Sequence, residues 1–534
     1  MKTLLILMAL SCTVANAQNP EDFAIELEPL VIPNAPSVHS YSWGATSDHK
    51  WVIIGGRVDG LHRRQPWAAF QEQDNNKNIM VIDPVTEQVW TADLSVLPSA
   101  MFEQLQSTNQ QFYQVDTMMY VTGGYGYNAT ALDHITYPNL TAISIDQVAD
   151  AVINGGNILP FFRQITNNNL KVTGGQLGYL NGTFYLVGGH LFDGRYNPMG
   201  PTHGPGFIQE YTNEIRKFEI IDDGVNLSVT NFDITTDTAN LHRRDYNMAA
   251  QIFPNGTEGF TAFSGVFNPN DLPYLNSVDI DEATYTVNNN FNQYLSQYHS
   301  AKIPVWDANA STMHTLFFGG ISQFTMDAQG NLVEDTDVPF VKTISKVTRF
   351  SNGNMQEAKL NYIEMPTLVG SGAEFIPSDQ YFLPREILDL NTVPQTKTLI
   401  GYIYGGIESS QENIFFINDG TQSSASNVIF KVYLNKSIAA VDETILSGDN
   451  IFKAHLYPVP ATNEITLAFN TIRPENMEYK IIDLSGKVLI EEKLEIKNEG
   501  EQEFNINIAN FAKGTYTLIL QNGVHSSNQQ FIKH

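Results

Sequence analysis

Two near copies of one cationic motif carry the clearest chemical signal in this 534-residue sequence. The first copy reads Leu-His-Arg-Arg at residues 61–64, and the second repeats these letters at residues 241–244, followed by Asp245. The planar guanidinium of arginine forms paired hydrogen bonds with carboxylates, sulfates and phosphates. If the fold brings the two copies together, the motif predicts binding of an anionic ligand, such as an acidic glycan.

Other polar residues accompany these motifs. The candidate binding rim consists of Arg57, His62, Arg63, Arg64, His190, Asp193, Arg195, His242, Arg243, Arg244 and Asp245. Six of the eleven arginines in the sequence belong to this rim, in a chain that is otherwise acidic. A structural interpretation of these arginines is favoured, in which each pairs with an Asp or Glu of a neighbouring unit and holds the loops in place. Ligand binding is the alternative.

Catalysis has less support than binding. Proton transfer on a sugar requires a general base within reach of the substrate. The candidates are Glu72, Asp193 and Asp245, and the sequence does not choose among them. Gly-x-Ser-x-Gly motifs and phosphate-binding glycine loops are missing from the sequence. The catalytic residues therefore remain unassigned.

The histidines do not predict a metal site. His62, His190, His242 and His299 lack the tight spacing of metal ligands, such as His-Glu-x-x-His. Cys12 is the single cysteine of the chain, so thiolate ligands are also lacking. We expect neither a metal nor a cofactor.

An internal repeat predicts the elements that position these residues. A β-rich apolar stretch ending in two glycines recurs at Val52–Gly56, Tyr120–Gly124, Tyr185–Gly189, Thr261–Gly265, Leu316–Gly320 and Tyr402–Gly406, with Ser264 replacing one glycine. Glycine permits the close backbone approach that is needed where several sheets crowd around one axis. With one strand before the pair and further strands after it, each unit predicts a four-stranded antiparallel sheet.

This pattern resembles the kelch family within the galactose oxidase and kelch superfamily. The shared features are the diglycine that ends the second strand, a later aromatic residue, and a Trp after the third strand, here Trp90. The resemblance implies an all-β fold, a six-bladed kelch-like β-propeller, with seven blades as the rival count. It also implies an enzymatic alternative, because sialate epimerases of this type act on a carboxylated sugar. The Tyr-Cys cofactor of galactose oxidase is excluded, since Cys12 lies in the predicted export signal.

Closing a propeller requires one blade to be assembled from both ends of the domain. Residues 23–30 alternate like an outer strand, and we predict that they pair with residues 427–433. In four-stranded blades, the loop after the second strand and the loop that enters the next blade emerge on the same face. This rule places the residues of the candidate rim together.

The end of the chain has a different character. Four segments resemble the type A sorting domain of the type IX secretion system: Leu456–Ala461, Ile481–Val488, Phe511–Leu518 and Gln530–His534. Their short alternating strands, separated by turns such as Ser485-Gly486, predict a small β-sandwich. The resemblance implies that the type IX machinery is a partner, that the tail is removed on export, and that the source is a Bacteroidota-type bacterium.

The domain organisation follows from these segments. Lys2, the apolar run Leu4–Leu10 and the small residues Ala15–Ala17 predict a signal peptide over residues 1–17. The propeller is predicted over residues 18–436, a linker over 437–450 and the sorting domain over 451–534. A formal net charge of −27 argues against nucleic-acid binding. After residue 17, no apolar stretch reaches the length that spans a bilayer.

Together these features predict a secreted or cell-surface protein that passes through the periplasm. The leading hypothesis is a kelch-repeat binding protein whose loop face recognises a glycan or a protein. The alternative is an epimerase- or lyase-like enzyme that acts on an acidic carbohydrate in the propeller mouth. The enzyme hypothesis predicts a carboxylate or histidine with a shifted pKa opposite the arginines.

Overall fold

The computed structural model describes residues 22–198, 204, 206–327, 330–378, 380–437, 441–446, 452, 454–471, 475–498, 500–522 and 526–534. Over this part of the chain the regular structure is mainly β-strand, with forty strands and two short α-helices, which confirms the all-β prediction. The predicted signal peptide, residues 1–17, lies outside the described residues.

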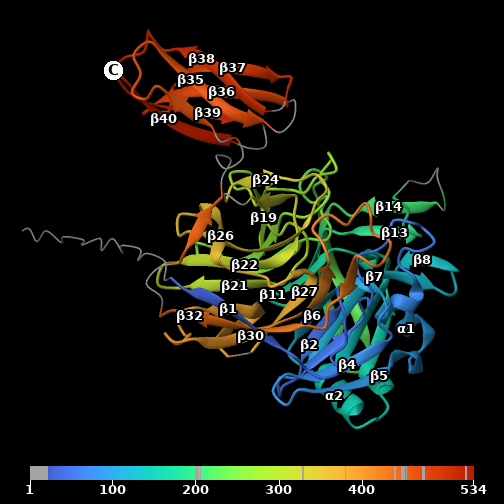
Figure 1. Cartoon of the computed structure of the whole chain (residues 1–534). Coiled ribbons are helices and arrows are strands. Elements are labelled where there is room, and N and C mark those ends of the chain that lie inside the picture. Colours follow the sequence, from blue (N-terminus) through green and yellow to red (C-terminus); the bar gives the residue numbers. More distant parts are fainter. Residues whose placement is uncertain are drawn as a thin grey trace, which may run out of the picture.

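Six sheets follow one another along the chain, one for each predicted repeat (Figure 1). Each contains four antiparallel strands, and three of the sheets carry further strands. The first three are β2 (Ser42–Ala45), β3 (Trp51–Ile54), β4 (Asn78–Asp83) and β5 (Gln88–Asp93); β6 (Thr108–Val115), β7 (Met118–Asn128), β9 (Asn139–Ser144) and β10 (Phe162–Thr166); and β11 (Gln176–Leu180), β12 (Thr183–Val187), β15 (Glu214–Asp222) and β16 (Leu227–Thr236). The next three are β17 (Asn247–Ile252), β18 (Glu258–Phe263), β19 (Ser277–Asp281) and β20 (Tyr285–Asn288); β21 (Lys302–Asp307), β22 (Thr312–Ile321), β25 (Phe340–Arg349) and β26 (Met355–Glu364); and β27 (Leu368–Pro377), β30 (Thr398–Ser409), β32 (Ile429–Asn435) and β1 (Ala24–Leu30).

Smaller elements decorate these sheets. The additional strands are β8 (Asp133–Thr136), β13 (His190–Gly194), β14 (Phe207–Tyr211), β23 (Phe324–Met326), β24 (Leu332–Glu334), β28 (Phe382–Leu383), β29 (Ile387–Asp389), β31 (Ser423–Ala425) and β33 (Glu443–Ile445). The helices are α1 (Ser99–Leu105) and α2 (Ile145–Ile153), with short 3₁₀ turns η1 (Glu72–Asp74), η2 (Leu94–Val96), η3 (Leu159–Phe161), η4 (Asn168–Leu170) and η5 (Pro384–Glu386). Strand β33 pairs with β26, so part of the range predicted as a linker extends the fifth sheet.

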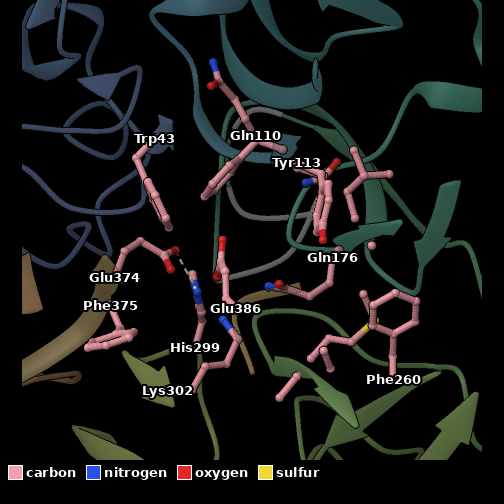
Figure 2. A pocket seen from close by; sticks show the side chains of 18 of the residues that line it. Trp43, Gln110, Tyr113, Gln176, Phe260, His299, Lys302, Glu374, Phe375 and Glu386 are labelled. Carbon is pink, nitrogen blue, oxygen red and sulfur yellow. Dashed lines mark ion pairs between the residues drawn. The ribbon is translucent and has the colours of Figure 1, made fainter. Parts of the chain in front are cut away.

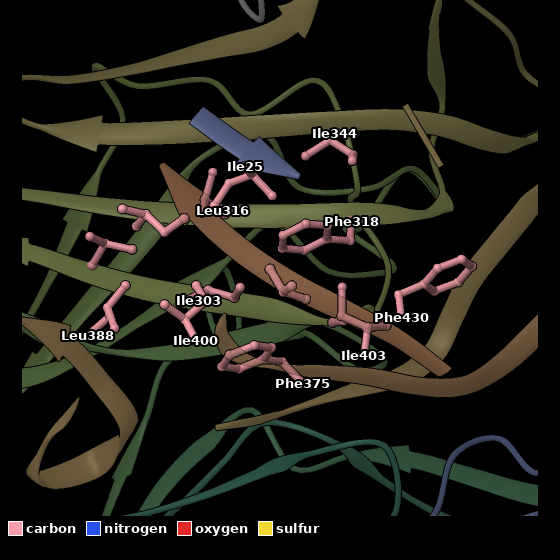
Figure 3. Packing of buried hydrophobic residues seen from close by; sticks show 14 of the residues in the cluster. Ile25, Ile303, Leu316, Phe318, Ile344, Phe375, Leu388, Ile400, Ile403 and Phe430 are labelled. Carbon is pink, nitrogen blue, oxygen red and sulfur yellow. The ribbon is translucent and has the colours of Figure 1, made fainter. Parts of the chain in front are cut away.

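The sixth sheet joins the two ends of this region. Strand β1 pairs antiparallel with β32, from Ala24 opposite Asn435 to Leu30 opposite Ile429. This register confirms the prediction that the first strand completes the last sheet. Ile25 of β1 is buried with Leu316, Ile403 and Phe430 in the core between the fifth and sixth sheets (Figure 3). Burial of such side chains stabilises the closure, since each contributes about 1.5–3 kcal/mol.

Each pair of neighbouring sheets shares a hydrophobic core of its own. Representative pairs are Ile54 with Val121, Leu140 with Leu186, Val187 with Met248, Phe263 with Phe317, Leu316 with Ile403, and Tyr402 with Trp51. The last pair joins the sixth sheet to the first, so each of the six sheets has a neighbour on both sides.

A closed ring of backbone hydrogen bonds also runs through all six sheets. In each bond, the backbone N–H of one residue donates to the backbone carbonyl oxygen of another. The pairs are Ser40 to Gly372 (2.9 Å), Asn109 to Ser40 (3.3 Å), Gly174 to Asn109 (3.2 Å), Asp245 to Gly174 (2.8 Å), His299 to Asp245 (2.9 Å) and Gly372 to His299 (3.0 Å). Each residue lies within or just before the first strand of its sheet. We call these six residues the waist ring.

The diglycines pack where neighbouring sheets come closest. Both residues of each pair have positive φ, a conformation that favours glycine. A Cβ atom at Gly123 would lie 1.9 Å from the carbonyl oxygen of Val172 in the next sheet, and one at Gly405 would lie 2.3 Å from that of Val38. The second glycine also bonds to the next sheet, as Gly124 N–H donates to Val172 (3.0 Å). The close approach predicted from the sequence is therefore present.

The tail forms a separate group of strands (Figure 1). One sheet contains β34 (His455–Tyr457), β35 (Glu464–Thr471) and β38 (Gly500–Asn507), and the other contains β36 (Glu475–Asp483), β37 (Val488–Ile496), β39 (Gly514–Gln521) and β40 (Ser526–Lys533). Ile465 and Leu467 of the first sheet share one buried core with Tyr479 and Leu518 of the second. This core has the two-layer form that the sequence predicts for the tail.

Candidate functional site

Two cavities meet at the waist ring. One, the loop cavity, has a volume of about 290 Å³ and is lined mainly by loops that follow second strands or enter the next sheet. The other, the strand cavity, has a volume of about 130 Å³ and is lined mainly by first strands. Ser40, Asn109, Asp245 and His299 line both, so these residues form the wall between the cavities.

The loop cavity brings together five of the eleven candidate rim residues. They are Arg57, His62, His190, Arg244 and Asp245. The other six, Arg63, Arg64, Asp193, Arg195, His242 and Arg243, do not line this cavity. The two copies of the cationic motif thus line one cavity with different residues. The first copy contributes Leu61 and His62, and the second contributes Arg244 and the following Asp245.

Eight Phe and Tyr side chains also line the loop cavity. They are Phe70, Tyr125, Phe192, Tyr196, Phe267, Tyr298, Phe340 and Phe415. None of these eight residues belongs to the candidate rim predicted from the sequence. A signal was available, because the residue that follows the diglycine lines this cavity in five of the six repeats: Arg57, Tyr125, His190, Ile321 and Ile407.

Arg244 is the cation best placed to meet a ligand. Its Nε donates to the Tyr211 hydroxyl at 3.1 Å, its Nη1 pairs with the Asp245 carboxylate, and its guanidinium lies 5.2 Å from the Phe267 ring centroid. Among the described residues, no hydrogen-bond acceptor is assigned to its Nη2. Burial opposes the charge of Arg244, but Asp245 and the neighbouring Tyr211 and Tyr298 together raise the pKa of the guanidinium. The cavity therefore holds an ionised guanidinium that is paired with the Asp245 carboxylate.

Two histidines in the loop cavity are neutral at physiological pH. His62 stacks on Phe70, with ring centroids 5.0 Å apart, and meets Tyr196 edge-on at 4.5 Å. Burial, helped by Arg244 and Arg57, lowers the pKa of His62 to about 4. Burial and Arg244 also hold the pKa of His190 well below its usual value. Neutral imidazoles offer hydrogen bonds without adding charge.

Arg57 borders the loop cavity but has a structural role, and its carboxylate partner lies in its own loop rather than in a neighbouring unit. Its side chain is 2% exposed and binds both carboxylate oxygens of Asp59 at 2.7 Å, while Nη1 donates to Asn75 at 2.8 Å. Although burial opposes ionisation of Asp59, His39 and Arg57 lower the pKa of that carboxyl to about 2. Arg57 therefore holds its own loop together.

Arg243 is structural as well, but among the described residues it pairs with no carboxylate. The side chain is 1% exposed and donates to the carbonyls of Asn240 (2.6 Å), Ser264 (2.6 Å) and Asn276 (3.0 Å), and to the Asn276 side chain. Its guanidinium also lies 4.0 Å from the Tyr274 ring centroid. Burial lowers the pKa of Arg243 to about 10. Backbone carbonyls thus replace the predicted Asp or Glu partner.

The remaining rim residues lie outside the loop cavity. Arg63 is exposed, and Arg64 lies over Phe416 at 4.6 Å. His242 stacks on Tyr211, with ring centroids 3.7 Å apart. Of the three general-base candidates, Asp193 pairs with Lys171 (2.6 Å), Glu72 pairs with Lys77 (3.2 Å), and Asp245 alone lines the loop cavity. Arg195 lines a separate open groove together with Glu72.

The strand cavity contains a charged cluster that sequence reasoning missed (Figure 2). His299 Nε2 lies 3.0 Å from an oxygen of Glu374, and Lys302 points into the same space. Burial opposes ionisation of Glu374, but His299 and Lys302 outweigh burial and lower the pKa of its carboxyl. The sequence held one sign of this cluster, because Glu374 is the single charged residue in strand β27. Within the described residues, no group of three or more His, Cys, Asp or Glu side chains is arranged to hold a metal.

Comparisons with known proteins identify the tail. Residues 455–534 match the family described as the secretion system C-terminal sorting domain. No curated protein matches the chain. Two solved structures show a remote likeness. One, "Structure of YjhT", is 11% identical over 78% of this chain and 99% of that one, with a TM-score of 0.43. The other, PorZ, a surface component of the type IX secretion system of Porphyromonas gingivalis, is 9% identical over 95% and 100%, with a TM-score of 0.13.

The sorting domain settles where the protein acts. Such domains mark proteins for export, so this chain is directed to the cell surface or the extracellular space. The domain also implies an interaction with the type IX secretion machinery. In the described part of the chain, every helix is too short or too polar to cross a membrane.

Proposed function

We propose that the six sheets, over residues 18–436, are the blades of a six-bladed kelch-type propeller, and that the exported protein binds a small acidic saccharide in the loop cavity. Residues 437–450 would then lead to the sorting domain at 451–534. The waist ring, the inter-sheet cores and the β1–β32 pairing support a cyclic arrangement with six units rather than seven.

The observation that carries the binding proposal is the placement of Arg244 in an aromatic cavity. An acidic sugar combines a carboxylate with a ring that has apolar C–H faces and polar hydroxyls. Arg244 matches the carboxylate, and aromatic rings such as Tyr125 and Phe192 match the C–H faces. The side chains of Gln209 and Asn109 are placed to bind hydroxyls. A cavity of about 290 Å³ is at the small end of ligand sites, which favours a single sugar unit.

The test is calorimetric titration of the purified protein with neutral and acidic monosaccharides, alongside Arg244→Gln. We expect acidic sugars to bind, neutral analogues to bind at least about tenfold more weakly, and Arg244→Gln to remove this preference. Arg216→Gln is the matched control, because Arg216 pairs with Glu214 at 2.6 Å and does not line the loop cavity. A folded protein that binds no sugar, or an Arg244→Gln variant that keeps the preference, would contradict the proposal.

Isomerase or lyase chemistry on an acidic sugar is a second candidate, favoured by the pairing of His299 with Glu374. An imidazole oriented by a buried carboxylate is a common arrangement for a general base. His299 borders the loop cavity, where Asp245 and Arg244 also lie. Incubating acidic sugars with the protein in D₂O and following deuterium uptake by NMR tests this candidate. His299→Gln is expected to abolish exchange while sugar binding persists; the absence of exchange with every bound sugar would exclude this chemistry.

A further inference from the structure

We propose that an open groove beside the loop cavity is a second saccharide subsite, so that the natural ligand is an oligosaccharide rather than a single sugar. The groove is lined by Trp67, Gln71, Glu72, Gln73, Lys77 and Arg195, and we call it the Trp67 groove. This inference rests on the proposed function of the loop cavity, and it extends that site outward to a second sugar unit.

Trp67 provides the platform of the groove. Its side chain is 71% exposed, whereas Trp43 and Trp51 are 7% and 2% exposed. Within the described residues, no aromatic ring or cation stacks on it. Keeping a large apolar ring in water is unfavourable. An exposed indole face is well suited to cover the C–H face of a sugar ring, as aromatic side chains do in other ligand sites.

Polar groups beside Trp67 supply the hydrogen bonds that a sugar requires. The Gln71 amide donates to the Trp67 carbonyl at 2.8 Å, and the Gln73 amide donates to Gln71 Oε1 at 2.7 Å. These bonds orient the two amides and leave one N–H of each for a hydroxyl. Arg195 has no ion pair or hydrogen bond assigned within the described residues, so its charge is available to an acidic substituent.

Residues that line the groove are close in sequence to residues that line the loop cavity. Trp67 of the groove is three residues from Phe70, which lines the loop cavity. Arg195 of the groove directly precedes Tyr196, which lines the loop cavity as well. The segments around Trp67 and Arg195 thus form a wall that separates the groove from the loop cavity, and some of their residues line the groove while others line the cavity. A glycan bound in the cavity could extend over this wall into the groove.

The loop that carries Trp67 is held in place before any ligand binds. His134 Nε2 lies 2.7 Å from the Phe70 carbonyl oxygen, and Arg57 Nη1 donates to the Gln71 carbonyl at 3.3 Å. These contacts fix the loop on both sides of the wall. A preorganised loop lowers the entropy lost on binding, which favours a ligand site over an unstructured connection.

The experiment compares sugars of different length. The probes are glucuronic acid, galacturonic acid and N-acetylneuraminic acid, each as the free sugar and as the end of a trisaccharide. They are titrated into the full protein, Trp67→Ala, and the control Val85→Ala, which removes a side chain that is 81% exposed in the β4–β5 turn. We expect a trisaccharide to bind about tenfold more tightly than its free sugar, and Trp67→Ala to remove only this gain.

Acrylamide quenching of tryptophan fluorescence gives an independent readout. Trp67 is expected to dominate quenching because it is exposed, whereas Trp43 and Trp51 are buried and Trp90 and Trp306 are partly buried. The trisaccharide is expected to protect it, and the free sugar to leave it accessible.

The outcomes separate the two proposals. Binding of the free sugar with no gain from length, or a gain that survives Trp67→Ala, would overturn the subsite and leave the loop cavity intact. If trisaccharide binding is lost in Trp67→Ala but unchanged in Arg244→Gln, the result would instead contradict saccharide binding in the loop cavity. If no saccharide binds the folded protein, both proposals fail, and a protein partner becomes the occupant to test.

Discussion

The two copies of the Leu-His-Arg-Arg motif have almost the same sequence and different structural roles. The first copy, residues 61–64, lies in the loop between β3 and β4, where its His lines the loop cavity and its two arginines lie outside it. The second copy, residues 241–244, ends shortly before β17, and there its first three residues support the fold while Arg244 lines the cavity. Position within the repeat unit, rather than local sequence, decides what each residue does.

Substitution of the third residue of the motif is expected to give the largest difference in stability between the two copies. Arg243→Gln should lower the free energy of unfolding by about 4 kcal/mol, because it leaves several buried carbonyls without a donor. Arg63→Gln should change it by less than about 0.5 kcal/mol, since Arg63 is exposed. Urea unfolding followed by tryptophan fluorescence measures both, because all five tryptophans lie in the six-sheet region. Equal losses in the two variants would show that the copies are equivalent after all.

Substitution of the first residue of the motif should give the next largest difference in stability between the two copies. Leu241 is 1% exposed within the core between the third and fourth sheets, whereas Leu61 is only partly buried. Leu241→Ala is expected to cost about 3 kcal/mol through lost burial and the cavity left behind, and Leu61→Ala about 1 kcal/mol. The same urea unfolding experiment compares them. A larger loss from Leu61→Ala would contradict the assigned burial.

The fourth residue of the motif separates the copies by ligand binding. Arg244→Gln should weaken binding of an acidic monosaccharide about tenfold or more, because it removes a charged donor from the cavity. Arg64 lies over Phe415 and Phe416, outside the loop cavity, so Arg64→Gln should change the Kd less than about twofold. Calorimetric titration of the two variants tests the difference. A larger effect of Arg64→Gln than of Arg244→Gln would indicate that the anion binds near Arg64, outside the loop cavity.

Substitution of the second residue of the motif should give the smallest difference between the two copies. The difference should appear in how stability depends on pH. The pKa of His62 is lowered to about 4, so the unfolded chain binds a proton more readily than the folded one below about pH 6.5. His62 therefore contributes to the loss of stability as pH falls from about 6.5 to about 4, and His62→Gln should reduce that loss.

His242→Gln provides the matched comparison for His62. Burial also lowers the pKa of His242, so this variant should act in the same direction. NMR titration of the ring C–H signals measures both groups, with His62 expected to remain neutral to about pH 4. A His62 signal that titrates near pH 6.5 would show that its ring is solvated and does not form part of the packed cavity wall.

Local sequence was sufficient for the features that repeat or pair in a simple order. Each diglycine marked a place where only glycine fits, as at Gly123, because positive φ and close backbone approach exclude a Cβ. Residues 23–30 were correctly paired with the last strand, since a cyclic arrangement leaves the two chain ends to share a sheet. The tail was identified because its short motifs lie close together in sequence.

Only the tertiary structure decided the roles of the side chains around the centre. Arg243 and Arg244 are adjacent in sequence, yet one is enclosed by carbonyls and the other faces a cavity. Glu374 and His299 come from different sheets, so no local pattern predicted their contact. The physical reason is that a residue type sets the interactions a side chain can make, whereas burial, charge and partners depend on which of six sheets lies opposite. The sequence alone determined the repeats, the closing strand and the sorting domain; the packing of the sheets decided which residues form the site.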